Sequence, residues 1–215
     1  MNRRHALQQL GALALLVGPA GHVLAQNPAG PAYQTLDPAV PTSAKGKIEV
    51  IEFFHYGCPH CRAFDPLLEQ WKKQMPADVH FVRVPAIWGN PQLQALARLY
   101  YTLEITGQVD KLHEKVFAAV QDDKVPLHTE DGVRSWIEKN GVDAKSFMAA
   151  YKSFGIESML KQADRSARDY KLQGVPTMAV DGRFITSASM TGSHEGTLKQ
   201  VDLLLARVRK EPRSS

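Results

Sequence analysis

The chain has 215 residues, with 26 lysines and arginines against 22 aspartates and glutamates, and a net charge of +4. A chain of this length forms one large domain or a smaller domain that carries an insertion. A charge so close to balance does not provide the strongly basic surface that nucleic-acid binding requires, so we expect no nucleic-acid partner.

The N-terminal segment has the features of an export signal. Arg3 and Arg4 precede an apolar stretch over residues 10–17, and residues 23–25 (Val-Leu-Ala) suit a signal peptidase. We predict a signal peptide over residues 1–25 and a mature chain that starts at Gln26. Ordinary secretion is favoured, and the arginine pair leaves twin-arginine export open. The apolar stretch is shorter than the roughly 20 residues that span a membrane, so we expect no membrane anchor.

The first folded unit is predicted to be a strand, a helix and a second strand. Residues 47–54 (Lys-Ile-Glu-Val-Ile-Glu-Phe-Phe) form a strand with a buried apolar end, which Tyr56-Gly57 breaks. Pro59 suits a first helical turn, and apolar residues then recur at helical spacing until Met75-Pro76. A strand over residues 79–84 completes a unit whose length fits a right-handed parallel crossover.

The pattern changes to helices alone between residues 88 and 163. Two apolar stripes come first, formed by Leu93, Leu96, Ala97, Tyr100 and Leu103, and by Val109, Leu112, Val116 and Val120. Two short helices follow, opened by Thr129 and Asp143, and the second has its apolar side on Phe147, Tyr151 and Phe154.

The C-terminal part returns to strands after a longer helix over residues 156–172. Strands are predicted over 177–180 and 183–186, joined by the turn pair Asp181-Gly182, and a helix over 195–208 ends the fold.

The two cysteines, Cys58 and Cys61, call for a local chemical explanation. They lie three positions apart, directly after a buried strand and on the first turn of a helix, where unpaired N–H groups and the helix dipole favour a thiolate. Cys58 is the expected nucleophile, Cys61 the resolving partner, and Pro59 and His60 the residues that tune the thiolate. An inert disulfide would close too small a ring to stabilise much, and zinc usually requires four ligands. We therefore predict a redox pair and no metal.

Two further features surround this pair. Val175-Pro176 precedes the returning strand, where a proline lies at the strand start or adopts the cis form; with the redox helix it indicates a cis-proline loop that faces Cys58. The backbone of Val175 could then pair with an extended substrate chain. Glu52 lies inside an apolar run, where burial would raise its pKa and make it a proton relay for Cys61. Alternatively, Glu52 faces water at the sheet edge or pairs with Arg83.

Together these residues resemble the DsbA family of periplasmic dithiol oxidases. The shared motifs are Glu52-Phe53-Phe54, Cys58-Pro59-His60-Cys61 and Gly174-Val175-Pro176, in the order and approximate spacing of the family. The resemblance implies an α/β thioredoxin fold over residues 26–87 and 164–215, interrupted by an all-helical domain over residues 88–163. One departure is Arg83, where some members have a lysine, so that proton transfer through Glu52 could be tuned differently.

The resemblance also implies the partners and the location. Reduced exported proteins would be the substrates, and a quinone-linked membrane oxidase of the DsbB type would restore the Cys58–Cys61 disulfide in the periplasm. We expect no cofactor and a monomer. The alternatives are a disulfide isomerase or reductant that uses the same cysteines, a redox-inert binding or chaperone module, and a carrier of zinc or copper.

Overall fold

The computed structural model describes residues 31–211, and the predicted signal peptide lies outside them. The described chain contains a five-stranded mixed sheet in the order β1-β5-β4-β2-β3. The strands are β1 (Gln34–Thr35), β2 (Ile48–Phe54), β3 (Val79–Pro85), β4 (Thr177–Val180) and β5 (Phe184–Thr186). The helices are α1 (Pro59–Lys73), α2 (Pro91–Ile105), α3 (Val109–Gln121), α4 (Glu130–Lys139), α5 (Ala144–Tyr151), α6 (Phe154–Asp169), α7 (Ala188–Thr191) and α8 (His194–Lys210).

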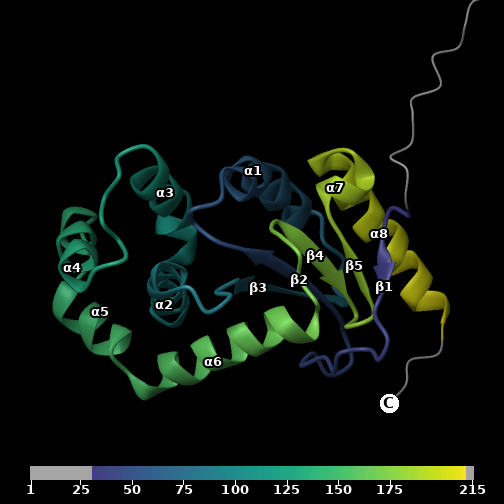
Figure 1. Cartoon of the computed structure of the whole chain (residues 1–215), viewed down its shortest axis with the longest axis horizontal. Coiled ribbons are helices and arrows are strands. Elements are labelled where there is room, and N and C mark those ends of the chain that lie inside the picture. The colour runs from purple at the N-terminus through teal and green to yellow at the C-terminus, as the bar shows by residue number, and fades with distance from the viewer. Residues whose placement is uncertain (1–30, 212–215) are drawn as a thin grey trace, which may run out of the picture.

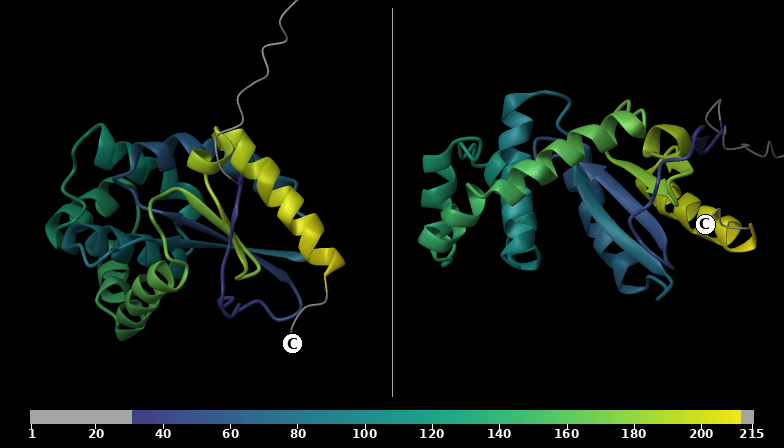
Figure 2. Two further views of the ribbon diagram at one scale, coloured as in Figure 1. Left: turned by 45° about the vertical axis from the view of Figure 1, so that its right-hand side comes forward. Right: turned by 90° about the horizontal axis from the view of Figure 1, so that it is seen from below.

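Strand β2 lies inside the sheet between β4 and β3, and every one of its residues is buried. It runs parallel to β3 and antiparallel to β4. Alternate side chains face opposite sides of the sheet, so Ile48 and Val50 join the core beneath α1 and α8, while Ile51 and Phe53 join the core on the side of α6. Figures 1 and 2 show these layers, with α1 and α8 on one face of the sheet and α6 across the other.

A helical insert follows β3 and projects from one end of the sheet. It contains α2 to α5, and α6 leads from it back along the sheet to β4 (Figure 1). The caps predicted for its short helices are present: the side chain of Thr129 accepts from Gly132 N, and that of Asp143 accepts from Lys145 N and Ser146 N. The fold is therefore the predicted α/β sheet with a helical insert.

Two details differ from the predictions. Phe154 does not lie on the apolar side of α5; it is the first residue of α6 and is 83% exposed, so that prediction is wrong. The two-residue strand β1 and the four-residue helix α7 were not predicted, because such short elements carry no periodicity. The helix predicted over residues 156–172, which contains the expected domain boundary between residues 163 and 164, is present as α6.

The turn between β4 and β5 also holds the N-terminal segment in place. Asp181 and Gly182 both have positive φ, 56° and 66°, as the predicted two-residue hairpin turn requires. The nitrogen of Val40 donates to the oxygen of Gly182 at 2.8 Å. A Cβ on Gly182 would lie 1.9 Å from the Val40 oxygen, so this approach requires glycine.

Candidate active site

Cys58 occupies the N-cap of α1, at the end of the loop that leaves β2. Its backbone is extended, with φ −91° and ψ 115°, and Pro59 begins the helix. The Cys58 nitrogen donates to the oxygen of His55 at 3.0 Å, which fixes the start of the turn. The sulfur accepts a hydrogen bond from the nitrogen of Cys61 at 3.3 Å. The N-terminal N–H groups of α1 are therefore directed at the Cys58 sulfur.

This position makes the two thiols chemically different. Both cysteines are free thiols in the structure. The hydrogen bond from the Cys61 side chain, followed by those from the backbone of Cys61 and His60 and by the charge of His60, lowers the pKa of Cys58 to about 6 against the opposing effect of burial. Burial raises the pKa of Cys61, and the nearby Cys58 and Glu52 add to that rise. At neutral pH Cys58 is thus a thiolate and Cys61 a thiol.

The loop before β4 faces the Cys58 sulfur. The Val175–Pro176 peptide bond is cis, and the oxygen of Val175 lies 3.5 Å from the Cys58 sulfur. A cavity of about 450 Å³ is lined by this loop and also by His60 and His194, whose ring centres lie 6.4 Å apart. Val175 therefore contacts the Cys58 sulfur and also lines the cavity.

Glu52 lies beneath α1 and is bound to a buried arginine. Because β2 and β3 are parallel and in register, Glu52 and Arg83 are direct neighbours in the sheet. The Arg83 Nε donates to Glu52 Oε2 at 2.7 Å, and both side chains are at most 3% exposed. Burial raises the pKa of Glu52, and the charge of Arg83 opposes this rise. Glu52 therefore does not face water, and the pairing with Arg83 is present.

Arg83 also joins Glu52 to helix α1. Its terminal nitrogen donates to Asp65 at 2.6 Å and to the more exposed Glu69 at 2.8 Å. His113 of α3 continues the network, with its Nε2 3.3 Å from Asp65 and its Nδ1 2.8 Å from the hydroxyl of Tyr56. Desolvation lowers the pKa of His113, so the ring is neutral and can both donate and accept.

Four residues of this site were not predicted: Tyr56, Asp65, His113 and Gln121, whose side-chain amide donates to the backbone oxygens of Tyr56 and Cys58. Asp65 left a signal in the sequence, because it lies one helical turn after Cys61 on the buried side of α1, where an acid needs a partner. His113 and Gln121 come from the helical insert and left no such signal, because only the tertiary fold brings α3 against the loop before Cys58.

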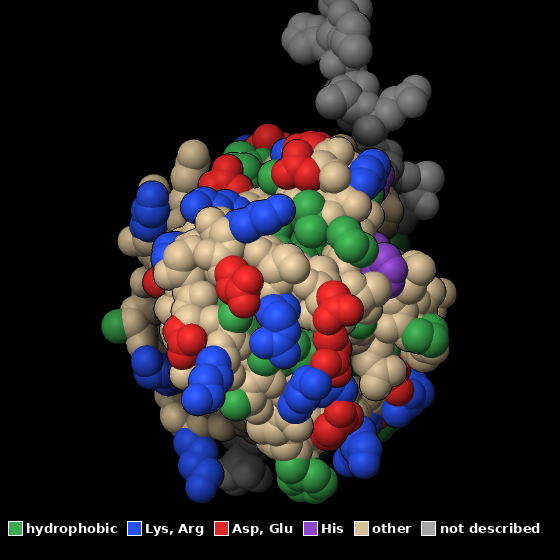
Figure 3. Space-filling view, turned by 90° about the vertical axis from the view of Figure 1, so that its left-hand side faces the viewer, with side chains coloured by type: hydrophobic (Ala, Val, Ile, Leu, Met, Phe, Trp, Pro, Cys, Tyr) green, Lys and Arg blue, Asp and Glu red, His purple; other side chains and the backbone are tan. Residues whose placement is uncertain are grey.

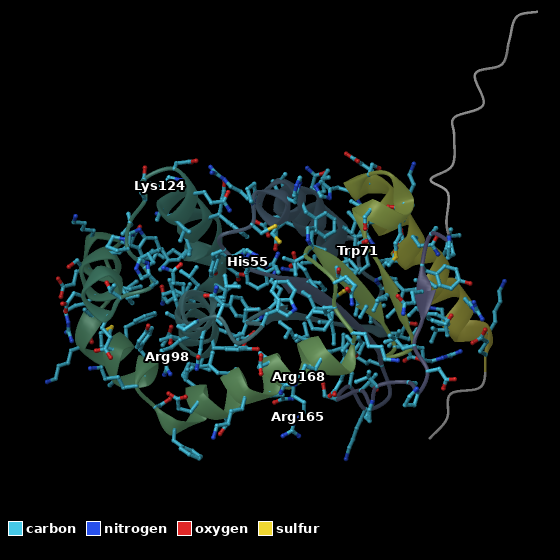
Figure 4. All side chains as sticks on the ribbon, viewed as in Figure 1. His55, Trp71, Arg98, Lys124, Arg165 and Arg168 are labelled. Carbon is cyan, nitrogen blue, oxygen red and sulfur yellow. The ribbon has the colours of Figure 1, made fainter. Side chains whose placement is uncertain are left out.

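His55 and Trp88 border the site on the side of the helical insert. Their rings meet edge to face with centres 6.1 Å apart, and Trp88 is 42% exposed. In Figure 4, His55 lies between the sheet and the helical insert, near the sulfur atoms. Its Nδ1 is buried and has no hydrogen-bond partner among the described residues, and burial lowers its pKa. A neutral ring and an indole therefore form an uncharged border beside the thiolate.

The described surface and helices add two observations. On the face formed by the helical insert, basic and acidic side chains are interspersed, and this face has no broad patch of one sign among the side chains drawn in colour (Figure 3). Within residues 31–211, no helix is long and apolar enough to cross a membrane, and no group of three or more His, Cys, Asp or Glu is placed to hold a metal ion.

Comparison with known proteins places this geometry in a family. The family described as "DSBA-like thioredoxin domain" matches residues 67–195. The thiol:disulfide interchange protein DsbA of Pseudomonas aeruginosa is 39% identical over 181 residues, which are 84% of this chain and 85% of the relative. DsbA of Burkholderia cepacia is 35% identical over 205 residues, which cover 93% and 96%. The chain belongs to the DsbA family. Like these relatives it is a thiol:disulfide oxidoreductase, with Cys58 and Cys61 as its CxxC pair.

Solved structures of the family share the fold. The crystal structure of Pseudomonas aeruginosa DsbA matches with a TM-score of 0.80 and 38% identity, covering 83% of this chain and 93% of that one. NmDsbA1 of Neisseria meningitidis matches with a TM-score of 0.75 and 26% identity, covering 84% and 93%. The mixed sheet with its helical insert is therefore the DsbA fold.

Proposed function

We propose that this DsbA-family protein is a dithiol oxidase that donates its Cys58–Cys61 disulfide to reduced exported proteins. The observation that carries the proposal is the position of the Cys58 sulfur at the N-cap of α1, where it accepts from Cys61 N at 3.3 Å and its pKa is lowered to about 6. A stabilised thiolate stabilises the reduced protein, so its disulfide is a stronger oxidant. A thiolate whose pKa lies one unit below the ambient pH of 7 stabilises the reduced protein by about 1.4 kcal/mol, which raises the potential of a two-electron couple by about 30 mV.

The reaction begins when a substrate thiolate attacks the sulfur of Cys58. The Cys58–Cys61 bond breaks, Cys61 leaves with the electron pair and takes up a proton, and a mixed disulfide joins Cys58 to the substrate. A second substrate thiolate then attacks the substrate sulfur of the mixed disulfide and releases Cys58 as its thiolate. Two electrons pass from the substrate to the pair, and the substrate gains one disulfide.

Glu52 is proposed as the proton relay for Cys61. It is buried beneath α1 with a raised pKa, and its charge raises the pKa of Cys61. A carboxyl of this kind can give a proton to the leaving Cys61 and take it back later. Glu52→Gln should slow thiol–disulfide exchange, and Glu49→Gln provides a matched control, because Glu49 is also buried on β2 but binds Ser43. Exchange kinetics of Glu52→Gln equal to those of the control would contradict this role.

Val175 and Pro176 are proposed to hold the substrate chain. The Val175 oxygen lies 3.5 Å from the Cys58 sulfur, at the edge of the cavity of about 450 Å³. A substrate segment paired with the Val175 backbone would place its own cysteine against Cys58. Main-chain pairing of this kind is tolerant of sequence, which suits an enzyme with many substrates.

The proposed setting is the periplasm of a bacterium. Residues 1–25 would be removed on export, and the mature protein would act as a monomer without a membrane anchor. A quinone-linked membrane oxidase of the DsbB type would then regenerate the disulfide. The discontinuous thioredoxin domain, residues 26–87 and 164–215, would carry the chemistry, with residues 88–163 as the insertion.

The deciding experiment is the equilibrium potential of Cys58–Cys61 against glutathione, followed by thiol alkylation. A potential well above the value of about −270 mV for thioredoxin supports the oxidase. A potential as reducing as that of thioredoxin would identify an exported reductant instead. Cys58→Ser is the control, because it removes the pair while Cys61 remains.

A further inference from the structure

Helix α3 ends against the loop that carries the nucleophile. Its last residue is Gln121. The side-chain amide nitrogen of Gln121 donates to the backbone oxygens of Tyr56, at 2.8 Å, and Cys58, at 3.1 Å. These acceptors lie 65 and 63 residues earlier in the chain, so the contact ties the helical insert to the active-site loop.

The two oxygens flank the most adaptable position of the loop. Gly57 separates Tyr56 from Cys58, and glycine lacks the Cβ that restricts the backbone of other residues. The nitrogen of Cys58 is held by His55, and its oxygen also accepts from Arg62 N at 3.2 Å. The Gln121 amide therefore restrains the Tyr56–Gly57 peptide before Gly57 and the Cys58–Pro59 peptide that begins helix α1.

The orientation of the Cys58–Pro59 peptide determines which N–H groups the Cys58 sulfur can accept hydrogen bonds from. The sulfur accepts from Cys61 N at 3.3 Å while ψ of Cys58 is 115°. A rotation about ψ would turn the carbonyl and the first helical turn together, away from the sulfur. The amide also places two N–H groups on oxygens whose partial negative charge would otherwise oppose a thiolate. Both effects favour the charged form of Cys58.

A neighbouring ion pair does not supply the same restraint. Arg62 and Asp122 are joined by two contacts of 2.6 Å, but their side chains are 38% and 56% exposed. Water and salt screen such a pair, so it contributes little. It also joins two side chains, whereas Gln121 binds the loop backbone itself.

We propose that Gln121 is a positioning residue of thiol–disulfide exchange, which holds the Tyr56–Cys58 backbone so that the sulfur of Cys58 stays over the first turn of α1. The inference rests on the proposed role of Cys58 as the nucleophile. It gives the helical insert a part in the chemistry, because the insert sets the acidity of a thiol that belongs to the sheet portion of the fold.

The test compares Gln121→Met, which removes the amide at similar length, with Gln121→Glu, whose carboxylate cannot donate. Gln162→Met is the matched control, since Gln162 is exposed on α6. The pKa of Cys58 is measured on the reduced proteins from thiolate absorbance against pH, and the equilibrium with glutathione is measured at pH 7. Thermal unfolding of the same samples records any loss of stability separately.

Gln121→Met should lower the thiolate-to-thiol ratio of Cys58 about three- to tenfold at a given pH, as expected for one lost hydrogen bond. Its disulfide should also become less oxidising. Gln121→Glu should have the larger effect, because it adds a charge that repels the thiolate, and it supplies the test if the methionine variant does not fold. Gln162→Met should match the unmodified protein.

An unchanged Cys58 pKa in Gln121→Met and Gln121→Glu, with only a lower melting temperature, would overturn the inference and leave Gln121 a structural contact. This outcome is distinct from a failure of the proposed function. In that case the unmodified protein would itself show an ordinary Cys58 pKa near 8.5.

Discussion

Replacement of Arg83 by methionine should destabilise the protein strongly, and more at neutral than at acidic pH. Arg83 is 3% exposed and bonds to Glu52 and Asp65, which are 2% and 9% exposed, and to Glu69, which is 42% exposed. The exposed pair contributes about 0–1 kcal/mol. Removing the guanidinium leaves the buried carboxylates of Glu52 and Asp65 without their positively charged partner, which typically lowers the free energy of unfolding by about 3–5 kcal/mol.

The pH dependence follows from proton uptake. Without Arg83, the already raised pKa of Glu52 rises further, so the folded variant binds a proton that the unfolded chain releases above about pH 4.5. The stability of the variant therefore falls as the pH rises from 4.5, and its deficit relative to the unmodified protein is larger at pH 7.5 than at pH 5. Arg83→Lys should lose about 1–3 kcal/mol, because one ammonium group cannot reproduce both buried contacts.

Urea unfolding of the reduced proteins at pH 5 and pH 7.5, followed by tryptophan fluorescence, measures these differences. Arg168→Met is the control: Arg168 is a 66% exposed arginine on α6 (Figure 4) and should change stability by less than about 0.5 kcal/mol. A deficit for Arg83→Met below about 1 kcal/mol, or one equal at the two pH values, would refute the electrostatic reasoning.

Three other predictions concern the thiol, the network and the hairpin turn. The alkylation rate of reduced protein by iodoacetamide should follow the thiolate of Cys58, with a midpoint near pH 6, and a midpoint near 8.5 would contradict the site geometry. His113→Gln should cost about 1–3 kcal/mol at pH 7.5 and less at pH 5, because the lowered pKa of His113 makes the unmodified protein lose stability as the pH falls below about 6.5; a deficit that grows at pH 5 would reverse this sign. Gly182→Ala should cost about 2–4 kcal/mol in urea unfolding, since its Cβ would lie 1.9 Å from the Val40 oxygen, whereas Gly46→Ala, with φ +75° and no atom within 4 Å, should cost only about 1 kcal/mol. Equal losses for the two alanine variants would show that the contact with Val40 is unimportant.

Local rules predict much of this fold. The strand before Cys58, the helix that begins at Pro59 and the turn at Asp181-Gly182 each depend on residues adjacent in the chain, and the structure contains all three. The caps at Thr129 and Asp143 are local in the same sense. Phe154 shows the limit of such rules, because its apolar character fits the periodicity of α5 although the chain has already turned into α6.

The site was predictable to the extent that its chemistry is local. The spacing of Cys58 and Cys61 and their place at a helix start identify the redox pair without tertiary information. An acid within an apolar strand indicates Glu52, whereas its pairing with Arg83 on the next strand was only one of the alternatives that the sequence left open. The residues that complete the network, His113 and Gln121, lie on α3, 57 and 65 residues after their partner Tyr56. Their contacts depend on how the helical insert packs against α1.

The order of the strands means that the active site is completed only by the C-terminal part of the chain. The ribosome makes the chain from its N-terminus, yet β1 pairs with β5, and β2 lies between β3 and β4, which are made more than 90 residues apart. The sulfur of Cys58 meets its partner loop only after 117 further residues have been added. Until then both thiols belong to an incomplete sheet, and the cis-proline loop that faces the Cys58 sulfur does not yet exist.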